Sequence, residues 1–184
     1  GPDLRVLVDA GEIIACDRVV LCVGAYAAQL LPGLLRTPPR GPLVAWRRVL
    51  AWTRPAPEHR PALADMPVWG AMTPEGFFYG FPFHDEGVEG FKLACHVTDE
   101  LTQLNQPVDP ESVSRAVSAD DLRPLENYLA RYMPTAQGTF VHQQVCMYGQ
   151  SQDGDFVIDL DPRDQRVCLA LGFSGHGFKF APVI

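Results

Sequence analysis

Hydrophobic and polar positions along this chain follow mainly a two-residue period, interrupted by short stretches with a helical period. Segments in which apolar residues alternate with polar ones, or run continuously for a few positions, are typical of β-strands. Hairpin-length turns containing Gly, Pro or Asp join several of these segments, which favours a largely antiparallel sheet. The predicted strands are Leu4 to Val8, Ile13 to Cys16, Arg18 to Val23, Val44 to Thr53, Phe77 to Phe81, Phe91 to Val97, Thr139 to Tyr148, Phe156 to Leu160 and Val167 to Leu171.

Helices are predicted between the strands and at the end of the chain. Residues 27–31 form a short helix that Pro32 should end, and a last helix should begin at the glycine-rich segment 172–180, just before the end of the chain. Asp109-Pro110-Glu111 supplies an N-cap, a first position and an acidic first turn. Ser118 and Asp121 have the spacing of a capping box. The helix that they open should bury a stripe and end before Pro134, the stripe being Leu122, Leu125, Leu129 and Tyr132.

The order of these elements predicts an α+β protein with a mixed, largely antiparallel sheet, flanking helices and two domains. Arg18 to Val23 is the kind of run that is buried in a parallel sheet, and it ends at Gly24 before a helix. This is the pattern of a trailing strand in a Rossmann-like dinucleotide-binding domain, although no Gly-x-Gly-x-x-Gly follows any strand. We therefore assign residues 1–36 to the end of one domain, 43–148 to a second, and 149–184 to a truncated return to the first, with a proline-rich linker at 37–42.

Composition narrows the possible partners. The net charge of −7 and the pI of about 5.1 argue against nucleic acid. The most apolar stretch, Val19 to Leu31, is too short to span a membrane, and the start of the chain has no signal-peptide pattern. That start lacks a methionine, so we expect a cut or processed chain. Five cysteines without a Cys-x-x-Cys pair argue against a disulfide framework and a metal site, and favour a reducing compartment.

One segment carries most of the chemical information. Glycine, histidine and lysine gather in Gly172-Phe173-Ser174-Gly175-His176-Gly177-Phe178-Lys179, directly after an apolar strand. Glycine lets the backbone approach a ligand, and a helix start directs free N–H groups at negative charge. By itself such a loop could bind phosphate, carboxylate or an anionic ring, or be a plain strand-to-helix turn. Together with Cys146-Met147-Tyr148 it resembles the family of monomeric sarcosine oxidase, N-methyltryptophan oxidase and pipecolate oxidase, in the D-amino-acid oxidase superfamily.

The resemblance covers nearly all of the chain and corresponds to roughly the second half of a family member. It implies FAD, attached through a thioether from Cys146 to the flavin, with Met147 beside it. A lone cysteine is otherwise a small buried hydrophobe. The resemblance further implies that the cofactor is contacted by Gly24, Gly172, Gly175, His176, Gly177 and Phe178, and that Lys179 grips the substrate carboxylate.

Alternation along Phe91 to Val97 places Lys92, Ala94 and His96 on one face of a strand and Cys95 on the other. Without the resemblance, a solvated face would be the expectation. The resemblance implies that Lys92 lies over the flavin and activates oxygen, and that His96 is a hydrogen-bond partner in the same pocket rather than the base. Tyr79 and Tyr148 match aromatic positions that frame the family's substrate pocket, and an extended loop is expected around Asp85-Glu86-Gly87.

The implied reaction is oxidation of the C–N bond of a small secondary amino acid, such as sarcosine, an N-methyl or a cyclic imino acid, to an imine, with formation of H2O2. The implied partners are that substrate, oxygen and a missing N-terminal half, in the cytoplasm, or in the peroxisome of a eukaryote. Two alternatives stay open: a flavin dehydrogenase with another electron acceptor, and an inactive binding or scaffold fragment.

Overall fold

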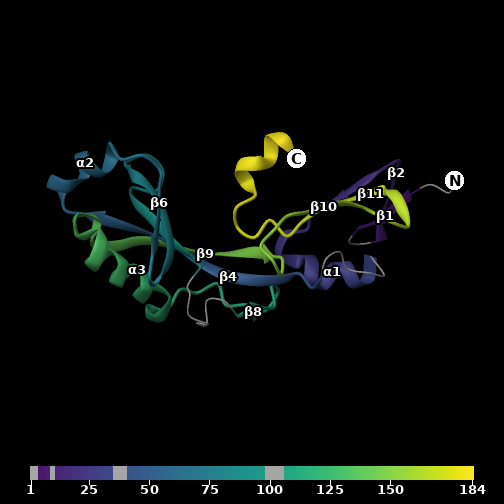
Figure 1. The fold of residues 1–184 in the computed structure, drawn as a ribbon, viewed down its shortest axis with the longest axis horizontal. Coiled ribbons are helices and arrows are strands. Elements are labelled where there is room, and N and C mark those ends of the chain that lie inside the picture. The colour runs from purple at the N-terminus through teal and green to yellow at the C-terminus, as the bar shows by residue number, and fades with distance from the viewer. Residues whose placement is uncertain (1–3, 9–10, 35–40, 98–105) are drawn as a thin grey trace. The chain divides into compact units, whose positions relative to one another are not determined.

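The structure is a computed structural model that describes residues 4–8, 11–34, 41–97 and 106–184 (Figure 1). Positions 37–40 of the predicted linker therefore lie outside the described residues. The chain divides into two compact units. Unit 1 comprises Gly1–Ala45 and Tyr148–Ile184, and unit 2 comprises Trp46–Met147. Strands β4 (Val44–Pro55) and β9 (Gly138–Gln150) each cross the boundary.

Unit 1 is built on a three-stranded sheet in the order β10 (Val157–Asp161), β11 (Asp164–Leu171) and β3 (Val19–Leu21). The pair β10–β11 is antiparallel, whereas β3 runs parallel to β11, as the continuous apolar run predicts. The predicted first hairpin is confirmed by β1 (Leu4–Leu7) and β2 (Ile13–Cys16), which pair separately. A 3-10 turn at Gly24–Tyr26 leads from β3 into α1 (Ala27–Leu34), and a 3-10 helix at Phe178–Val183 stands where the last helix was expected.

Helix α1 continues past the residue that was expected to end it. Pro32 lies inside the helix, where it removes one backbone donor and its ring crowds the preceding turn. Ala27 and Leu31 are buried in the core of unit 1, and burial of a leucine side chain contributes about 1.5–3 kcal/mol. That burial favours continuing the helix for part of another turn despite the proline.

Unit 2 contains a six-stranded sheet in the order β5-β6-β7-β4-β8, with β9 also paired to β4. The predicted strands are confirmed as β4, β6 (Gly76–His84), β7 (Gly90–Val97) and β9. Three short elements were not predicted: α2 (Arg60–Ala64), β5 (Trp69–Thr73) and β8 (Pro107–Val108). Two 3-10 turns, Pro57–His59 and Pro134–Ala136, complete the unit. The mixed α+β class with a largely antiparallel sheet is thus confirmed.

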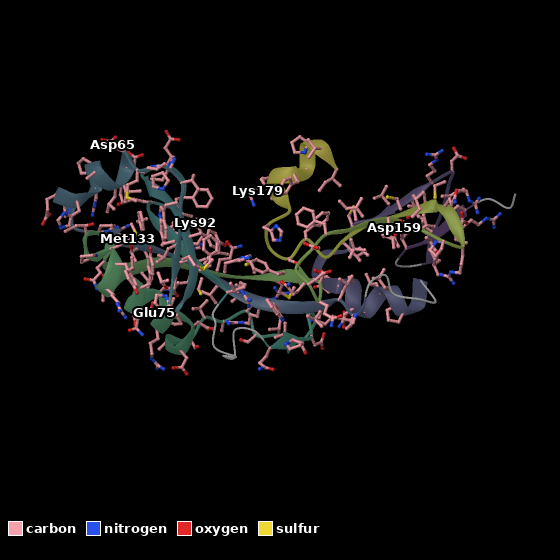
Figure 2. All side chains as sticks on the ribbon, in the orientation of Figure 1. Asp65, Glu75, Lys92, Met133, Asp159 and Lys179 are labelled. Carbon is pink, nitrogen blue, oxygen red and sulfur yellow. The ribbon has the colours of Figure 1, made fainter. Side chains whose placement is uncertain are left out.

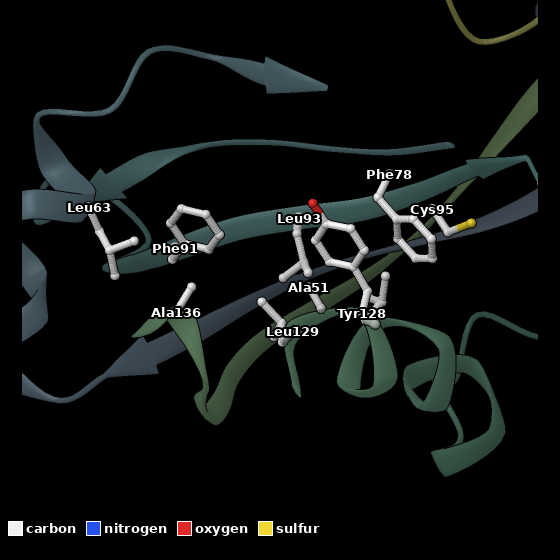
Figure 3. Close-up of a cluster of buried hydrophobic side chains, with 10 residues drawn as sticks. Ala51, Leu63, Phe78, Phe91, Leu93, Cys95, Tyr128, Leu129 and Ala136 are labelled. Atoms are coloured by element: carbon white, nitrogen blue, oxygen red, sulfur yellow. The ribbon is translucent and has the colours of Figure 1, made fainter. Parts of the chain in front are cut away.

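Helix α3 (Ala119–Tyr132) packs on one face of this sheet and forms the core of unit 2 (Figure 3). The predicted capping box is present, since the Ser118 side chain accepts from the Asp121 N–H and the Asp121 carboxylate accepts from the Ser118 N–H. Tyr128, rather than the predicted Tyr132, is buried, and its ring stacks on Phe78 at 4.3 Å. Tyr132 is 38% exposed because its hydroxyl donates to a Glu75 carboxylate oxygen at 2.9 Å.

The helix predicted from Asp109 is only a single turn. The Asp109 side chain accepts from the Glu111 N–H at 3.0 Å, as an N-cap would. Further along, the carbonyls of Ser114 and Ala116 accept hydrogen bonds from the guanidinium of Arg47 at 3.0 and 2.8 Å. Carbonyls that face a distant arginine cannot continue a helical ladder, so the local signal is overridden.

Candidate functional site

The sheet of unit 2 has a second face, which we call the lysine face because β7 carries Lys92, Ala94 and His96 on it. Register defines its neighbours: on β4, Trp52 lies opposite Lys92 and Leu50 opposite Ala94. On β6, Tyr79 lies opposite Ala94. The alternation predicted from the sequence holds, because Leu93 and Cys95 point instead into the core with α3. The structure therefore brings three of the predicted site residues, Lys92, His96 and Tyr79, onto one surface.

Phe81 in β6 adds an aromatic ring to the lysine face, at the start of a bulge. Gly80 pairs with Leu93 and Phe83 pairs with Phe91, so two residues, Phe81 and Pro82, lie opposite the single residue Lys92. Proline is tolerated at a bulge because no ladder hydrogen bond is required of it there. The loop expected around residues 85–87 is a turn that connects β6 to β7.

The ammonium of Lys92 lies between two aromatic rings. Its Nζ is 4.9 Å from the centre of the Trp52 ring and 5.0 Å from the centre of the Phe81 ring. Both distances are within the range of a cation–π interaction. His142 on β9 contacts Trp52 edge-on, with ring centres 4.9 Å apart. Neither Trp52 nor Phe81 was identified from the sequence, where each reads as an ordinary strand aromatic.

His96 lies beside two aromatic rings of β6. Its ring centre is 5.8 Å from that of Phe77 and 6.3 Å from that of Tyr79, both edge-on. Its backbone carbonyl accepts a hydrogen bond from Nε of Arg48 at 2.8 Å. His96 is therefore held at both its backbone and its ring, at the end of β7 away from the bulge.

Cys146 is half-buried on β9, next to the half-buried Met147. Burial raises the pKa of the Cys146 thiol, and the positive charges of Arg48 and Lys92 act against that rise. Burial raises the pKa of Cys95 to about 11, which makes that thiol inert at neutral pH. Of these two cysteines, only Cys146 has two cations acting on it.

Arg48 is a site residue that sequence reasoning missed. The pair Arg47-Arg48 reads as strand surface with one paired side chain. Arg47 is indeed paired, with Asp121, but Arg48 is only 2% exposed. Its guanidinium stacks over Trp46 at 4.8 Å and donates to the carbonyls of His96 and Arg47. A buried guanidinium keeps its charge in all practical conditions, so unit 2 contains a fixed cation close enough to influence Cys146.

The glycine-rich loop in unit 1 packs on Tyr148. At Gly175, φ is +78° and a Cβ would lie 2.4 Å from Cε2 of the Tyr148 ring. At Gly177 a Cβ would lie 2.5 Å from Cδ1 of Phe173. Gly172 also has a positive φ, of +61°. The loop thus needs glycine for close approach to two rings of its own unit.

A buried serine pair anchors the start of this loop. Ser174 has a φ of +49°, the one left-handed non-glycine among the described residues, and is 3% exposed. Its N–H donates to the Gly149 carbonyl at 3.0 Å, its Oγ donates to the Gly172 carbonyl at 3.0 Å, and that Oγ lies 3.2 Å from Oγ of Ser151. Gly149 in turn has no room for a Cβ, because the Gly24 carbonyl oxygen would lie 2.7 Å from it. Gly24, predicted to contact the cofactor, therefore lies against the strand that anchors the loop.

His176, Lys179 and Phe178 of the loop differ in their contacts and in their exposure. His176 Nε2 lies 3.1 Å from the Gly154 carbonyl, and its ring is 4.8 Å from that of Phe156. Lys179 is exposed, and its Nζ donates to the carbonyl of His176 at 3.0 Å. Phe178 is 96% exposed. The helix that follows has six residues and 3-10 geometry without a side-chain cap, so backbone N–H groups, rather than the dipole of a long helix, are what it can offer a ligand.

Among the basic residues of the chain, lysine is much rarer than arginine. The sequence contains 15 lysines and arginines, and only Lys92 and Lys179 are lysines (Figure 2 labels both). In every ion pair that the structure shows, the positively charged partner is an arginine. An ammonium is a compact point charge with rotatable donors, which a guanidinium cannot imitate. The two lysines therefore coincide with the two positions for which the sequence motifs predict a chemical role.

Other features of the described residues lie away from these positions. A pocket of about 1110 Å³ beside α3 is lined by Arg47, Glu75, Arg131 and their neighbours, and contains none of the predicted site residues. In the described part of the chain, no group of three or more His, Cys, Asp or Glu side chains could hold a metal ion. No helix in that part has the length and apolar character needed to cross a membrane.

Comparison with known proteins defines the class to which this fold and these residues belong. The model of the family "FAD dependent oxidoreductase" matches residues 3–184. The chain belongs to this family.

Similar curated proteins include monomeric sarcosine oxidase of Bacillus sp. (strain B-0618), 33% identical over 98% of this chain and 44% of that protein. N-methyl-L-tryptophan oxidase of Yersinia pestis (strain Pestoides F) is 30% identical over 92% of this chain and 42% of that protein. The chain thus spans less than half the length of these relatives. Among solved structures, fructosamine oxidase from Aspergillus fumigatus (Amadoriase II) has a TM-score of 0.70 at 21% identity, over 96% of this chain and 41% of its own. NikD, an amino acid oxidase, has a TM-score of 0.67 at 22% identity, over 98% of this chain and 45% of its own. These two likenesses support the fold.

Proposed function

We propose that the chain is part of an FAD-dependent oxidase that converts a small secondary amino acid to an imine and forms hydrogen peroxide. Unit 2 is its substrate domain and unit 1 is part of its FAD-binding domain, completed by sequence that the relatives carry in their remaining length. Sarcosine-like, N-methyl or cyclic imino acids are the substrate class, by analogy with the two curated relatives. FAD, when bound, accepts two electrons from the substrate and passes them to oxygen.

The residues present fit this cofactor. A half-buried thiol is influenced by two cations, an ammonium lies between aromatic rings, and a loop carries glycine at positions 172, 175 and 177. These are the groups needed to hold a flat ring that becomes negatively charged on reduction. We assign Gly24, Gly172, Gly175, His176, Gly177 and Phe178, together with Met147, to contacts with FAD.

Each predicted catalytic side chain has a defined task. Lys92 places a positive charge on the lysine face, where it stabilises the negative charge that oxygen acquires on its first reduction. His96 donates or accepts a hydrogen bond at the substrate amine, and Tyr79 and Tyr148 frame the substrate. Lys179 binds the substrate carboxylate as an ion pair, which orients the C–N bond for oxidation. Its ammonium has three donors, so it can bind the carboxylate while it still donates to the His176 carbonyl.

The observation that carries the proposal is the placement of Lys92, His96 and Tyr79 on one face of the sheet of unit 2. At Cys146, burial raises the pKa of the thiol, and Arg48 and Lys92 act against that rise, in the direction of the thiolate that covalent attachment requires. Cys146 would hold FAD through a bond from its Sγ to the methyl carbon at the flavin 8 position. Forming that bond would remove the thiol proton and a hydrogen of the methyl group, and oxygen would take up the two electrons and two protons as hydrogen peroxide.

Acid precipitation of the purified flavoprotein tests the attachment. We expect a yellow, fluorescent pellet from the native protein and a colourless pellet from Cys146→Ser, with Cys95→Ser as the matched control that keeps the colour. A colourless native pellet would refute covalent attachment. Peroxide release with sarcosine, assayed with and without an artificial electron acceptor, tests the oxidase; activity that needs the acceptor would identify a dehydrogenase instead.

A further inference from the structure

The proposed function assigns no role to the two aromatic rings beside Lys92. They come from the two strands that flank β7: Trp52 lies opposite Lys92 on β4, and Phe81 lies opposite it in the bulge of β6. The lysine stem has four rotatable carbons, so an ammonium beside one ring could still swing away. An ammonium with a ring on each side, at 4.9 and 5.0 Å, has a single favoured position.

We propose that Trp52 and Phe81 are positioning residues that hold the Lys92 ammonium at one point on the lysine face, where oxygen is reduced. This inference rests on the proposed role of Lys92. Electrostatic catalysis depends on charges that are already in place when the reaction begins, because moving a charge or reorienting water during the reaction costs free energy. Two rings provide that placement.

Aromatic rings also hold a cation without neutralising it. No carboxylate of the described residues forms an ion pair with Lys92. A carboxylate would cancel much of the field that oxygen is to experience, whereas a ring attracts the ammonium through its quadrupole and leaves its net charge unpaired. Trp52 is itself held by the edge-on contact with His142.

The low lysine content allows a direct test of the geometry, independent of flavin chemistry. Within this chain, reductive methylation with ¹³C-formaldehyde labels the side chains of Lys92 and Lys179 alone, and the dimethylated side chain keeps its charge. We expect a methyl signal that is absent in Lys92→Met and is displaced upfield by two rings, further than the signal of Lys179, because Lys179 Nζ lies 5.7 Å from a single ring, that of Phe180. Trp52→Leu should move that signal toward the position of Lys179.

Trp46→Leu is the matched control for this spectrum. It makes the same substitution on the same strand and removes the same kind of cation–π contact, but with Arg48 as the cation. The Lys92 signal should stay where it is in the native protein. A native signal without an upfield displacement, or one that Trp52→Leu leaves unchanged, would overturn the proposed placement.

The functional half of the inference is tested on the flavin-loaded protein. We expect Trp52→Leu and Phe81→Leu each to slow reoxidation by oxygen about tenfold, relative to reduction by substrate, the scale of one cation–π interaction. Phe81 is 41% exposed, so its substitution keeps the test valid if Trp52→Leu fails to fold.

Two results would overturn the functional half, and they are distinguishable. If Lys92→Met slows the oxygen step but neither ring substitution does, Lys92 acts without positioning by the rings. If Lys92→Met leaves the oxygen step unchanged, the proposed role of Lys92 fails, and the positioning role fails with it, even where the methyl spectrum shows the rings in place.

Discussion

Replacing Gly175 with alanine tests whether the glycine loop packs directly on Tyr148. Gly175 has a φ of +78°, and its absent Cβ would lie 2.4 to 2.6 Å from three carbons of the Tyr148 ring. Tyr148 is 8% exposed, so its ring has little room to move aside. Alanine at this position therefore meets two separate obstacles, one in its own backbone and one in its neighbour.

The expected cost follows from adding these obstacles. An L-residue in the left-handed region costs about 1–2 kcal/mol. Inserting a methyl group where a buried ring already lies costs about 1–3 kcal/mol. Gly175→Ala should therefore lower the free energy of unfolding by about 2–5 kcal/mol.

Gly11 provides a control that has the first obstacle without the second. Its φ is +81°, and nothing lies within 4 Å of its absent Cβ. Gly11→Ala should cost only the backbone part, about 1–2 kcal/mol. Urea unfolding of both variants, followed by tyrosine and tryptophan fluorescence, measures the difference. Equal destabilisation by the two substitutions would refute the packing of the loop on Tyr148.

The carboxyl of Asp121 and the serine pair of the loop yield two more tests. Burial by itself would raise the pKa of Asp121, but hydrogen bonds from Arg47 and Ser118 outweigh it and hold that pKa below its usual value. A carboxyl whose pKa is lowered by folding stabilises the folded state above its unfolded pKa of about 3.9. That stabilisation is lost as the pH falls through the lower, folded pKa, so acid titration of stability below about pH 4 should be steeper for the native protein than for Asp121→Asn. Ser174→Ala leaves the polar partners of Ser174 unsatisfied and should lower the free energy of unfolding by about 1–3 kcal/mol. In a double-mutant cycle measured by urea unfolding, Ser151→Ala should cost less in the Ser174→Ala background than in the native protein. Strict additivity of the two costs would argue against the pair.

The elements that could be predicted from the sequence are those whose signal is local. Strand β7 alternates along its whole length, and the capping box of α3 lies within four residues, so both predictions are confirmed. The helix predicted from Asp109 was wrong because its carbonyls face the distant Arg47. Strand β5 was missed because glycine and exposed apolar residues in it weaken the alternating pattern.

The same distinction applies to the candidate site. The glycine loop is contiguous in sequence, and the placement of Lys92 and His96 on one face requires only a regular strand. Burial of Arg48 could not be predicted, because adjacent arginines on a strand are indistinguishable until one face is known to be covered. Its side chain meets the carbonyl of His96, 48 positions away.

The rings at Lys92 depend on register, which is the least local property of a sheet. In β6 Gly80 pairs with Leu93, so Phe81 falls opposite Lys92; the pairing then shifts by one residue, and Phe83 rather than Pro82 pairs with Phe91. Without the shift, alternation would turn every residue beyond it to the other face. The bulge therefore keeps Phe83 packed against the core residues with α3, while the register before it places Phe81 beside the ammonium. A cation held in this way is a product of three strands, and no single segment of the sequence encodes it.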